Sequence, residues 1–388
     1  MTPIINPAAS VHAKPFVRFL YISNARWFCP AEVARCRHVI RPDVQVHATG
    51  GTATGTQEER TLDRTAIHGD RKPDGGARED RRMIRNLKEL VEEARKLGPA
   101  KVVVIEAQNR EVLESLKEAE PMRLAEPLLV GDPARIERVA RDVGYTVRPE
   151  TLLRTSSEDE SLRLSVDLVR DGKADFLMKG KIPTAKMVRA VLDKERGLRV
   201  GLLSQVVLYQ VPRIPRLLII SDAAINIAPT LEQKAEICRN AIEVAHAIGI
   251  EEPKVALLAA LEFVNPAMPA TVDAAALTQM NRRGQITGAY LEGPLAMDVP
   301  FSRFAAECKN IQSPVVDAAD ILIAPDIEAA NILGRAATYL AGAESGGVVV
   351  GTKTPLVLLS RAEPPESKIY SIALALLVMH HQKKSRPA

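Results

Sequence analysis

The chain has 388 residues, 46% of them hydrophobic, which is enough for one or two buried cores and excludes a disordered chain, a collagen or a coiled coil. Lys and Arg total 52 against 48 Asp and Glu, and this small net charge of +4 argues against nucleic acid as the main partner. No apolar run reaches the roughly 18 to 20 residues of a membrane span, and the four cysteines lack the spacing of a zinc site or a disulfide framework. We therefore expect a cytoplasmic protein with no membrane association and no bound metal.

The first 82 residues differ in composition from the rest and hold 13 Lys or Arg against 9 Asp or Glu. Residues 48–80 contain Gly, Thr and charge with almost no large apolar side chain, so they are predicted to be disordered. Three interpretations remain open for 1–82. The favoured one is an upstream start that overextends the true chain, because Met83 opens the first amphipathic pattern; the others are a flexible natural extension and an organelle-targeting peptide, since 1–42 are Arg-rich.

From Met83 onward, helical and strand patterns alternate. Helical spacing of apolar residues predicts helices over 86–97 and 110–119, with a strand at 101–106 between them. Further short apolar runs predict strands at 128–130, 176–178, 200–203, 217–220, 255–258, 321–324, 348–350 and 356–359. Uniformly apolar strands are typical of sheets buried on both faces, which predicts an α/β fold with largely parallel sheets covered by helices. Ligands of such sheets bind at the carboxyl ends of the strands.

The turn after the predicted strand 176–178 carries two cations. Lys179, Gly180 and Lys181 follow the strand, and Pro183 suits the first position of a helix. Lysine side chains and free backbone N–H groups together predict an anion site. The alternative is that both lysines are solvated in a surface turn.

The turn after 217–220 contains Asp222 and Asn226 before a helix. Thr230 with Gln233 predicts a capping box at the start of that helix, which is a structural role. Turn geometry alone can explain Asp222 and Asn226, and so can ligand binding.

The turn after 321–324 offers an aspartate and an asparagine. Asp326 fits the N-cap of the following helix, which accounts for it without a ligand. Asn331 lies one turn into that helix, where Asn is a mediocre helix former. Its amide is therefore predicted either to meet a ligand at the strand end or to cap a neighbouring loop.

The last turn, within 351–368, presents Ser360 and Arg361 after the predicted strand 356–359, and Pro364 with Pro365 starts the final helix. A hydroxyl, a guanidinium and a helix N-terminus together favour a phosphate or a developing oxyanion, although a Ser-Arg pair by itself is common. The sequence has no GxxxxGK[ST], GxGxxG, HExxH or GxSxG motif and no Cys/His cluster, so nucleotide hydrolysis, zinc peptidase and nucleophile-elbow chemistry lose weight.

Four ordered segments resemble the phosphate acetyltransferase and phosphate butyryltransferase family: MKGKIPT (178–184), SDAAINIAPTLEQKAEI (221–237), DAADILIAPDIEAANIL (317–333) and LLSRAEPPESKIYSIALA (358–375). The resemblance implies a two-domain α/β fold similar to isocitrate and isopropylmalate dehydrogenases. It implies a domain I of 83–205 plus 350–388, a domain II of 206–349 and an active-site cleft between them. It also implies a homodimer or larger homo-oligomer and the reaction of acyl-CoA with phosphate to give acyl phosphate and CoA, with CoA as substrate and no permanently bound cofactor.

By this resemblance Ser360 is expected near the thioester carbonyl and Arg361 on the phosphate. Further expected substrate-binding residues are Lys179, Lys181, Asn331, Asp326 and Asn226. Acetyl-specific members carry an acidic base six positions after the arginine of the Ser-Arg pair. That offset lands here on Ser367, so Glu366 just before it is either the base or a helix-terminus charge. KGKIPT and the Ser-Arg-Ala turn leading into SIALA resemble the butyryl branch, which implies a short-chain acyl group longer than acetyl, with an acetyltransferase as the alternative.

Two rival functions remain on the same fold. A metal- and NAD-dependent hydroxyacid dehydrogenase needs clustered aspartates, but Asp317 and Asp320 precede the strand 321–324 instead of following it. A non-catalytic acyl-CoA or acyl-phosphate sensor would keep the cleft and lack the base. The apolar last helix, 369–378, is either a dimer contact or part of the core.

Overall fold

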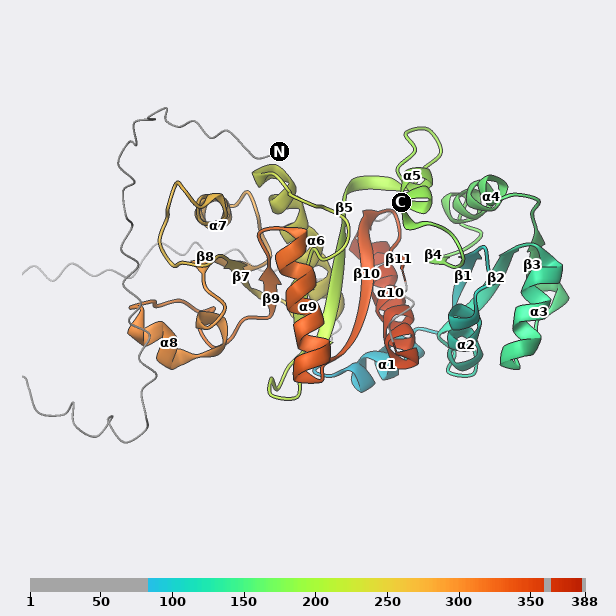
Figure 1. The fold of residues 1–388 in the computed structure, drawn as a ribbon, viewed down its shortest axis with the longest axis horizontal. Helices are drawn as coiled ribbons and strands as arrows, with labels where there is room; N and C mark the ends of the chain where they lie inside the picture. Colours follow the sequence, from blue (N-terminus) through green and yellow to red (C-terminus); the bar gives the residue numbers. More distant parts are fainter. Residues whose placement is uncertain (1–82, 359–363, 386–388) are drawn as a thin grey trace, which may run out of the picture. The chain divides into compact units, whose positions relative to one another are not determined.

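Helices and strands alternate along the described part of the chain (Figure 1), which covers residues 83–358 and 364–385 of a computed structural model. These residues belong to one compact unit. The strands are β1 (Ala100–Ile105), β2 (Ala125–Gly131), β3 (Leu152–Arg154), β4 (Phe176–Lys179), β5 (Arg199–Gln210), β6 (Leu218–Ser221), β7 (Lys254–Leu258), β8 (Tyr290–Leu295), β9 (Ile321–Ile323), β10 (Glu344–Thr352) and β11 (Leu356–Val357). The prediction of disorder for 48–80 lies outside the described residues.

Most of the α-helices form where helical spacing of apolar residues follows a capping side chain. The α-helices are α1 (Leu87–Lys96), α2 (Arg110–Ala119), α3 (Pro133–Val143), α4 (Glu158–Arg170), α5 (Thr184–Val191), α6 (Leu231–Ala247), α7 (Pro269–Arg282), α8 (Arg303–Cys308), α9 (Ile327–Ala341) and α10 (Pro365–Ser385). Of these, α5 and α7 begin without a capping side chain. Two short 3-10 turns add η2 (Pro149–Thr151) and η3 (Val299–Phe301). The side chains of Asn86, Asp132 and Ser157 accept backbone N–H groups at the starts of α1, α3 and α4. No helix within 83–358 or 364–385 is long and apolar enough to cross a membrane.

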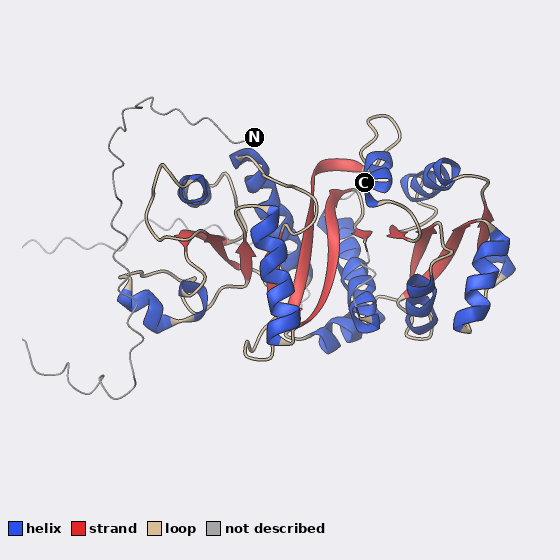
Figure 2. Ribbon diagram, viewed as in Figure 1, coloured by secondary structure: helices blue, strands red, loops and turns tan. Residues whose placement is uncertain are grey.

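The strands form a single sheet of eleven in the order β3-β2-β1-β4-β11-β10-β5-β6-β9-β7-β8 (Figure 2). Within the described residues seven of the ten strand pairs are parallel, which confirms the predicted largely parallel architecture. The antiparallel pairs all involve β5 or β10, the two long strands at the middle. These two strands lie between two parallel halves of the sheet. One half contains β1, β2, β3, β4 and β11, and the other contains β6, β7, β8 and β9.

Alternate side chains of β5 face opposite helical layers, as the period of two in a strand requires. Val206 and Leu208 pack in a cluster with α6 and α10, whereas Val207 and Tyr209 pack in a cluster that includes Ala330 of α9. A third cluster joins β1, β4 and β11 to α4 and α5. The sheet is therefore covered by helices on both faces, which explains why its strands read as uniformly apolar.

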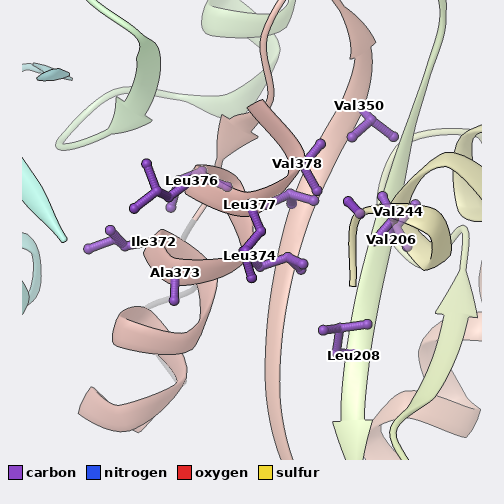
Figure 3. Packing of buried hydrophobic residues seen from close by; sticks show 14 of the residues in the cluster. Val206, Leu208, Val244, Val350, Ile372, Ala373, Leu374, Leu376, Leu377 and Val378 are labelled. Carbon is purple, nitrogen blue, oxygen red and sulfur yellow. The ribbon is translucent and has the colours of Figure 1, made fainter. Parts of the chain in front are cut away.

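The last helix, α10, lies in the core. Ile372, Leu374, Leu377 and Val378 are buried, and Figure 3 shows the side chains of α10 gathered against β10 and β5. This answers the question left open for 369–378: the apolar surface of this segment is used inside the chain. An expected dimer takes no support from this helix.

Two strands at the sheet edges escaped prediction, because edge strands carry weaker apolar signals. β3 is three residues long, and β8 contains Gly293 and Pro294, which lower the strand propensity and are tolerated at an edge. The predicted strand 200–203 is the start of β5, which continues to Gln210.

Candidate active site

The register of the sheet brings the carboxyl ends of four strands to one level. β4 pairs with β11, β10 with β5, and β5 with β6, which in turn pairs with β9. Because β5 and β10 are antiparallel to each other, β4 and β11 run in the opposite direction to β6 and β9. All four strands nevertheless end at the same level of the sheet. One row across the sheet contains Met178, Val357, Val348, Val206, Ser221 and Ile323. The polar turns of the four motif segments begin at, or just beyond, this row.

The turn after β4 is held tightly against the end of β1. The Gly180 N–H donates to the Ile105 carbonyl at 2.9 Å, and the Lys181 N–H donates to the Glu106 carbonyl at 2.8 Å. A Cβ on Gly180 would collide with both carbonyls, so only glycine fits there. Lys179 is half-buried and Lys181 is exposed, and Ile182 packs in the same apolar cluster as Ile225 and Leu358 from the second and fourth segments.

The turn after β6 is organised by the carboxylate of Asp222, which is buried. Its Oδ1 accepts N–H groups from Gln205, Ala224 and Ile225, and its Oδ2 accepts the Asn226 N–H at 3.0 Å and the Asn226 Nδ2 at 2.6 Å. Asn226 Nδ2 also donates to the Leu203 carbonyl at 2.7 Å. These bonds give Asp222 and Asn226 a structural role in shaping the turn. The capping box of Thr230 and Gln233 at the start of α6 is confirmed.

The turn after β9 connects to the β6 turn. Asp326 Oδ1 accepts the Ala329 N–H at 2.8 Å, so Asp326 is the N-cap of α9 as predicted. One turn further, Asn331 Nδ2 donates to the Ala223 carbonyl at 3.2 Å. The side chain of Asn331 therefore caps a neighbouring loop, one of its two predicted roles, at the level where the strands end.

The fourth segment is described on either side of 359–363. Ser360 and Arg361 lie outside the described residues. Pro365 begins α10, as predicted, with Glu366 exposed in the first turn and Ser367 buried. Burial and a 3.0 Å hydrogen bond to Glu344, together with the charges of Glu344 and Glu366, raise the pKa of Tyr370 to about 12.

A small cavity of about 70 Å³ lies where three of the segments meet. It lies on the α9 side of β5 and is lined by Gln205, Val207, Tyr209, Ala223, Asn331, Gly334, Arg335, Thr338, Tyr339, Ser345 and Pro364. The structure thus brings Asn331 to the start of the α10 segment, whereas Lys181 lines a different cavity at the ends of β1 to β4.

Lys368 is a residue of this region that the sequence analysis did not select. It is only 3% exposed and makes no hydrogen bond or ion pair with any residue in the described part of the chain. Its stem packs in the core while its ammonium is not fully buried, so the charge is open to an approaching anion. The available signal is that Lys368 is the only Lys or Arg within 362–382.

Asp320 lies at the opposite end of β9 from Asp326. It accepts the Lys254 N–H at 2.9 Å and lies 3.7 Å from Arg216. Burial raises the pKa of this carboxyl. Asp320 therefore has a structural role at the amino end of β9, the position that the sequence predicts for it.

A largely parallel sheet covered by helices, with polar motifs collected at its strand ends, is the architecture of an α/β enzyme. Residues 146–376 match the family model described as phosphate acetyl/butaryl transferase. The chain is 41% identical over 297 residues to the phosphate butyryltransferase of Clostridium acetobutylicum, which covers 76% of this chain and 99% of the relative. It is 45% identical over 290 residues to the phosphate acetyltransferase of Thermotoga maritima, with 74% and 98% covered.

Among solved structures, the branched-chain phosphotransacylase from Enterococcus faecalis V583 matches with a TM-score of 0.63 and 32% identity, covering 73% of this chain and 99% of that one. A phosphotransacetylase from Streptococcus pyogenes matches in fold with a TM-score of 0.64 at 21% identity. The chain belongs to the phosphate acetyl/butyryltransferase family.

Proposed function

We propose that the chain is a phosphate acyltransferase that converts an acyl-CoA and phosphate into an acyl phosphate and CoA. The observation that carries this proposal is the convergence of the four motif segments at one level of the sheet, together with the family membership. In the reaction a phosphate oxygen attacks the thioester carbonyl carbon, a C–O bond forms, the C–S bond breaks, and the thiolate leaves and takes up a proton.

The residues proposed for this chemistry match its needs. Arg361 holds the phosphate through paired N–H donors, and Ser360 donates a hydrogen bond to the oxyanion of the tetrahedral intermediate. Lys179 and Lys368 add positive charge around the phosphate. Asn331 and Asn226 order the adjoining turns through their bonds to Ala223 and Asp222, so we assign them positioning roles. Asp326 acts by fixing the start of α9.

Glu366 is the proposed base and acid for the CoA thiol. It is exposed at the first turn of α10, whereas Ser367 at the family offset is buried and has no basic group. In the reverse direction Glu366 would take the thiol proton as the sulfur attacks the acyl phosphate.

The 70 Å³ cavity beside Asn331 is proposed to hold the acyl chain. Val207, Ala223 and Gly334 give its wall an apolar part beside polar side chains, and the buried Tyr209 closes one side. The small volume supports an acyl group of only a few carbons, such as butyryl. We further propose that 83–205 with 350–388 and 206–349 act as two domains that enclose the substrates.

A homodimer is proposed as the working assembly. Its support is the outer surface of α9, where Ile332, Tyr339 and Leu340 are exposed large hydrophobic side chains. Light scattering should give twice the chain mass for the wild type and a monomer mass for Leu340→Glu. A monomeric wild type would reject the dimer.

The activity is tested by measuring CoA thiol release from acetyl-, propionyl-, butyryl- and isobutyryl-CoA with and without phosphate. We expect release to require phosphate and to be fastest at four carbons. Glu366→Gln should lower the rate about a hundredfold, in line with the loss of a general acid–base. A clearly higher efficiency with acetyl-CoA would reject the chain-length assignment, and tight CoA binding without turnover would favour a sensor.

A further inference from the structure

The wall of the small cavity beside Asn331 is largely polar. Of its eleven lining residues, seven carry a side chain that can form hydrogen bonds: Gln205, Tyr209, Asn331, Arg335, Thr338, Tyr339 and Ser345. Among the described residues, no aspartate or glutamate lines it. A plain hydrocarbon chain in this cavity would therefore meet hydrogen-bonding groups over much of the wall.

One side of the cavity comes from the sheet and the other from a helix. Gln205, Val207 and Tyr209 are alternate residues of β5, so their side chains face the same side of the sheet. Ser345 of β10 pairs with Tyr209, and residues directly opposite each other in an antiparallel pair share a face. The opposite side is one face of α9, whose lining residues lie three or four positions apart: Asn331, Gly334, Arg335 and Thr338.

Gln205 presents a side-chain amide that the fold does not use. The residue is half-buried, and its amide forms no hydrogen bond with the residues that the structure describes. The amide is not sealed in the core, so a ligand in the cavity can reach it. The backbone that carries it is fixed, because the Gln205 N–H donates to the buried carboxylate of Asp222 at 3.1 Å and the Gln205 carbonyl accepts the Ser221 hydroxyl at 2.8 Å.

Ser345 adds a second polar group of this kind. Its hydroxyl is half-buried and bonds to no residue in the described part of the chain. Water satisfies such groups while the cavity holds no ligand. An apolar acyl chain would displace that water and leave the Gln205 amide unpaired, which costs free energy, whereas a hydroxyl on the acyl chain would replace the lost hydrogen bond.

We propose that the acyl group transferred by this chain is a short hydroxyacyl group of four carbons, with its hydroxyl bonded to the side-chain amide of Gln205. The inference rests on the proposed function and extends it by naming the class of acyl group. An amide both donates and accepts hydrogen bonds, as a hydroxyl does. The cation of the wall, Arg335, is exposed, so its charge is solvated and a carboxylate on the acyl chain would gain less from it.

The test compares kcat/KM for butyryl-CoA, 3-hydroxybutyryl-CoA and 4-hydroxybutyryl-CoA at saturating phosphate. The wild type should prefer one of the hydroxyacyl substrates to butyryl-CoA by about tenfold or more, because only that substrate pairs the amide. Gln205→Leu, which removes the amide and keeps an apolar side chain, should bring this ratio to about one. Gln279→Leu is the matched control, since Gln279 is exposed on α7 and does not line the cavity.

Three results would overturn the inference. They are a wild type that uses butyryl-CoA as well as both hydroxyacyl substrates, a preference that persists in Gln205→Leu, and a higher efficiency with succinyl-CoA, which carries a carboxylate. Phosphate-dependent release from butyryl-CoA would still support the acyltransferase in each case.

A binding measurement separates this inference from the proposed function. The same CoA thioesters, titrated calorimetrically into the full chain without phosphate, should bind the wild type about tenfold more tightly when they carry the preferred hydroxyl, and Gln205→Leu should bind them equally. Such a difference in a chain that shows no turnover would reject the acyltransferase and support the hydroxyacyl site. Equal binding of all three thioesters to the wild type would overturn the inference whether or not the chain is active.

Discussion

The side-chain amide of Asn331 donates a hydrogen bond of 3.2 Å to the backbone carbonyl of Ala223, 108 residues earlier in the chain. This bond ties α9 to the turn after β6, and both residues line the small cavity that Pro364 also borders. One asparagine therefore joins two of the four motif segments, and the cavity that it lines reaches a third. The predictions below follow from this arrangement.

Asn331→Ala should lower kcat/KM about tenfold and destabilise the fold by about 1 kcal/mol, the usual net value of one hydrogen bond. The activity loss should exceed what unfolding explains, because the turn after β6 loses its anchor to α9. Chemical denaturation and steady-state kinetics measure the two effects. Glu328→Gln, exposed on the same helix, is the control. Wild-type kinetics in Asn331→Ala would show that the bond has no part in positioning.

Gly334→Ala should shift the acyl preference toward shorter chains. A Cβ at this position would collide with the hydroxyl of Tyr209, which is buried across the cavity. The displaced ring narrows the space, so kcat/KM for butyryl-CoA should fall by at least about tenfold more than that for acetyl-CoA. Gly334→Ala combined with Tyr209→Phe removes the colliding oxygen and should recover the original preference. Parallel losses for both substrates in Gly334→Ala would place the acyl chain elsewhere.

Lys368→Met should raise stability while it lowers activity. Methionine keeps the packing of the buried lysine stem and removes a partly desolvated charge, so the free energy of unfolding should rise by up to about 1 kcal/mol. The KM for phosphate should increase by about tenfold or more if Lys368 adds to the positive charge of the site. Lys353→Met changes an exposed lysine and should do neither. Lower stability with an unaltered KM would mean that Lys368 is structural.

Tyr370 should contribute to alkaline unfolding. Its folded pKa is about 12, above the ordinary value of 10, so between these pH values the unfolded chain loses a proton that the folded chain retains. The stabilisation from this group is complete below pH 10 and is lost as the pH rises toward 12. Tyr370→Phe should therefore show a shallower fall of unfolding midpoint over this window, and Tyr339→Phe should behave as the wild type. Equal slopes in all three proteins would contradict this.

Strand runs and capping residues could be predicted because each depends on neighbours in the sequence. The caps at Thr230 and Asp326 are confirmed, as is the start of the last helix at Pro365. The sequence predicts that the sheets are largely parallel, but it does not predict the order of the strands. That β5 and β10 unite both halves in one sheet depends on long-range pairing that no local pattern encodes.

In the candidate site, too, local features could be predicted from the sequence and long-range contacts could not. The turns were identified from their polar residues, but the engagement of the Asn226 amide by Asp222 depends on a loop conformation. Lys368 was passed over because a lysine in a helix is ordinarily solvated, and only the packing of α10 buries it. Lys181 borders the cavity at β1 to β4, and its expected role beside Lys179 in binding substrate stays a prediction.

Acyl transfer to phosphate is proposed to take place at the Ser360–Arg361 turn. The most direct test measures the release of CoA thiol from butyryl-CoA at increasing phosphate concentrations. It compares the wild type with Arg361→Ala and Arg361→Lys. We predict saturable dependence on phosphate in the wild type and a loss of about a hundredfold or more in Arg361→Ala. Arg361→Lys should recover only a small part, because lysine cannot bind phosphate with two parallel bonds. Phosphate-dependent release that is equal in all three proteins would contradict the account.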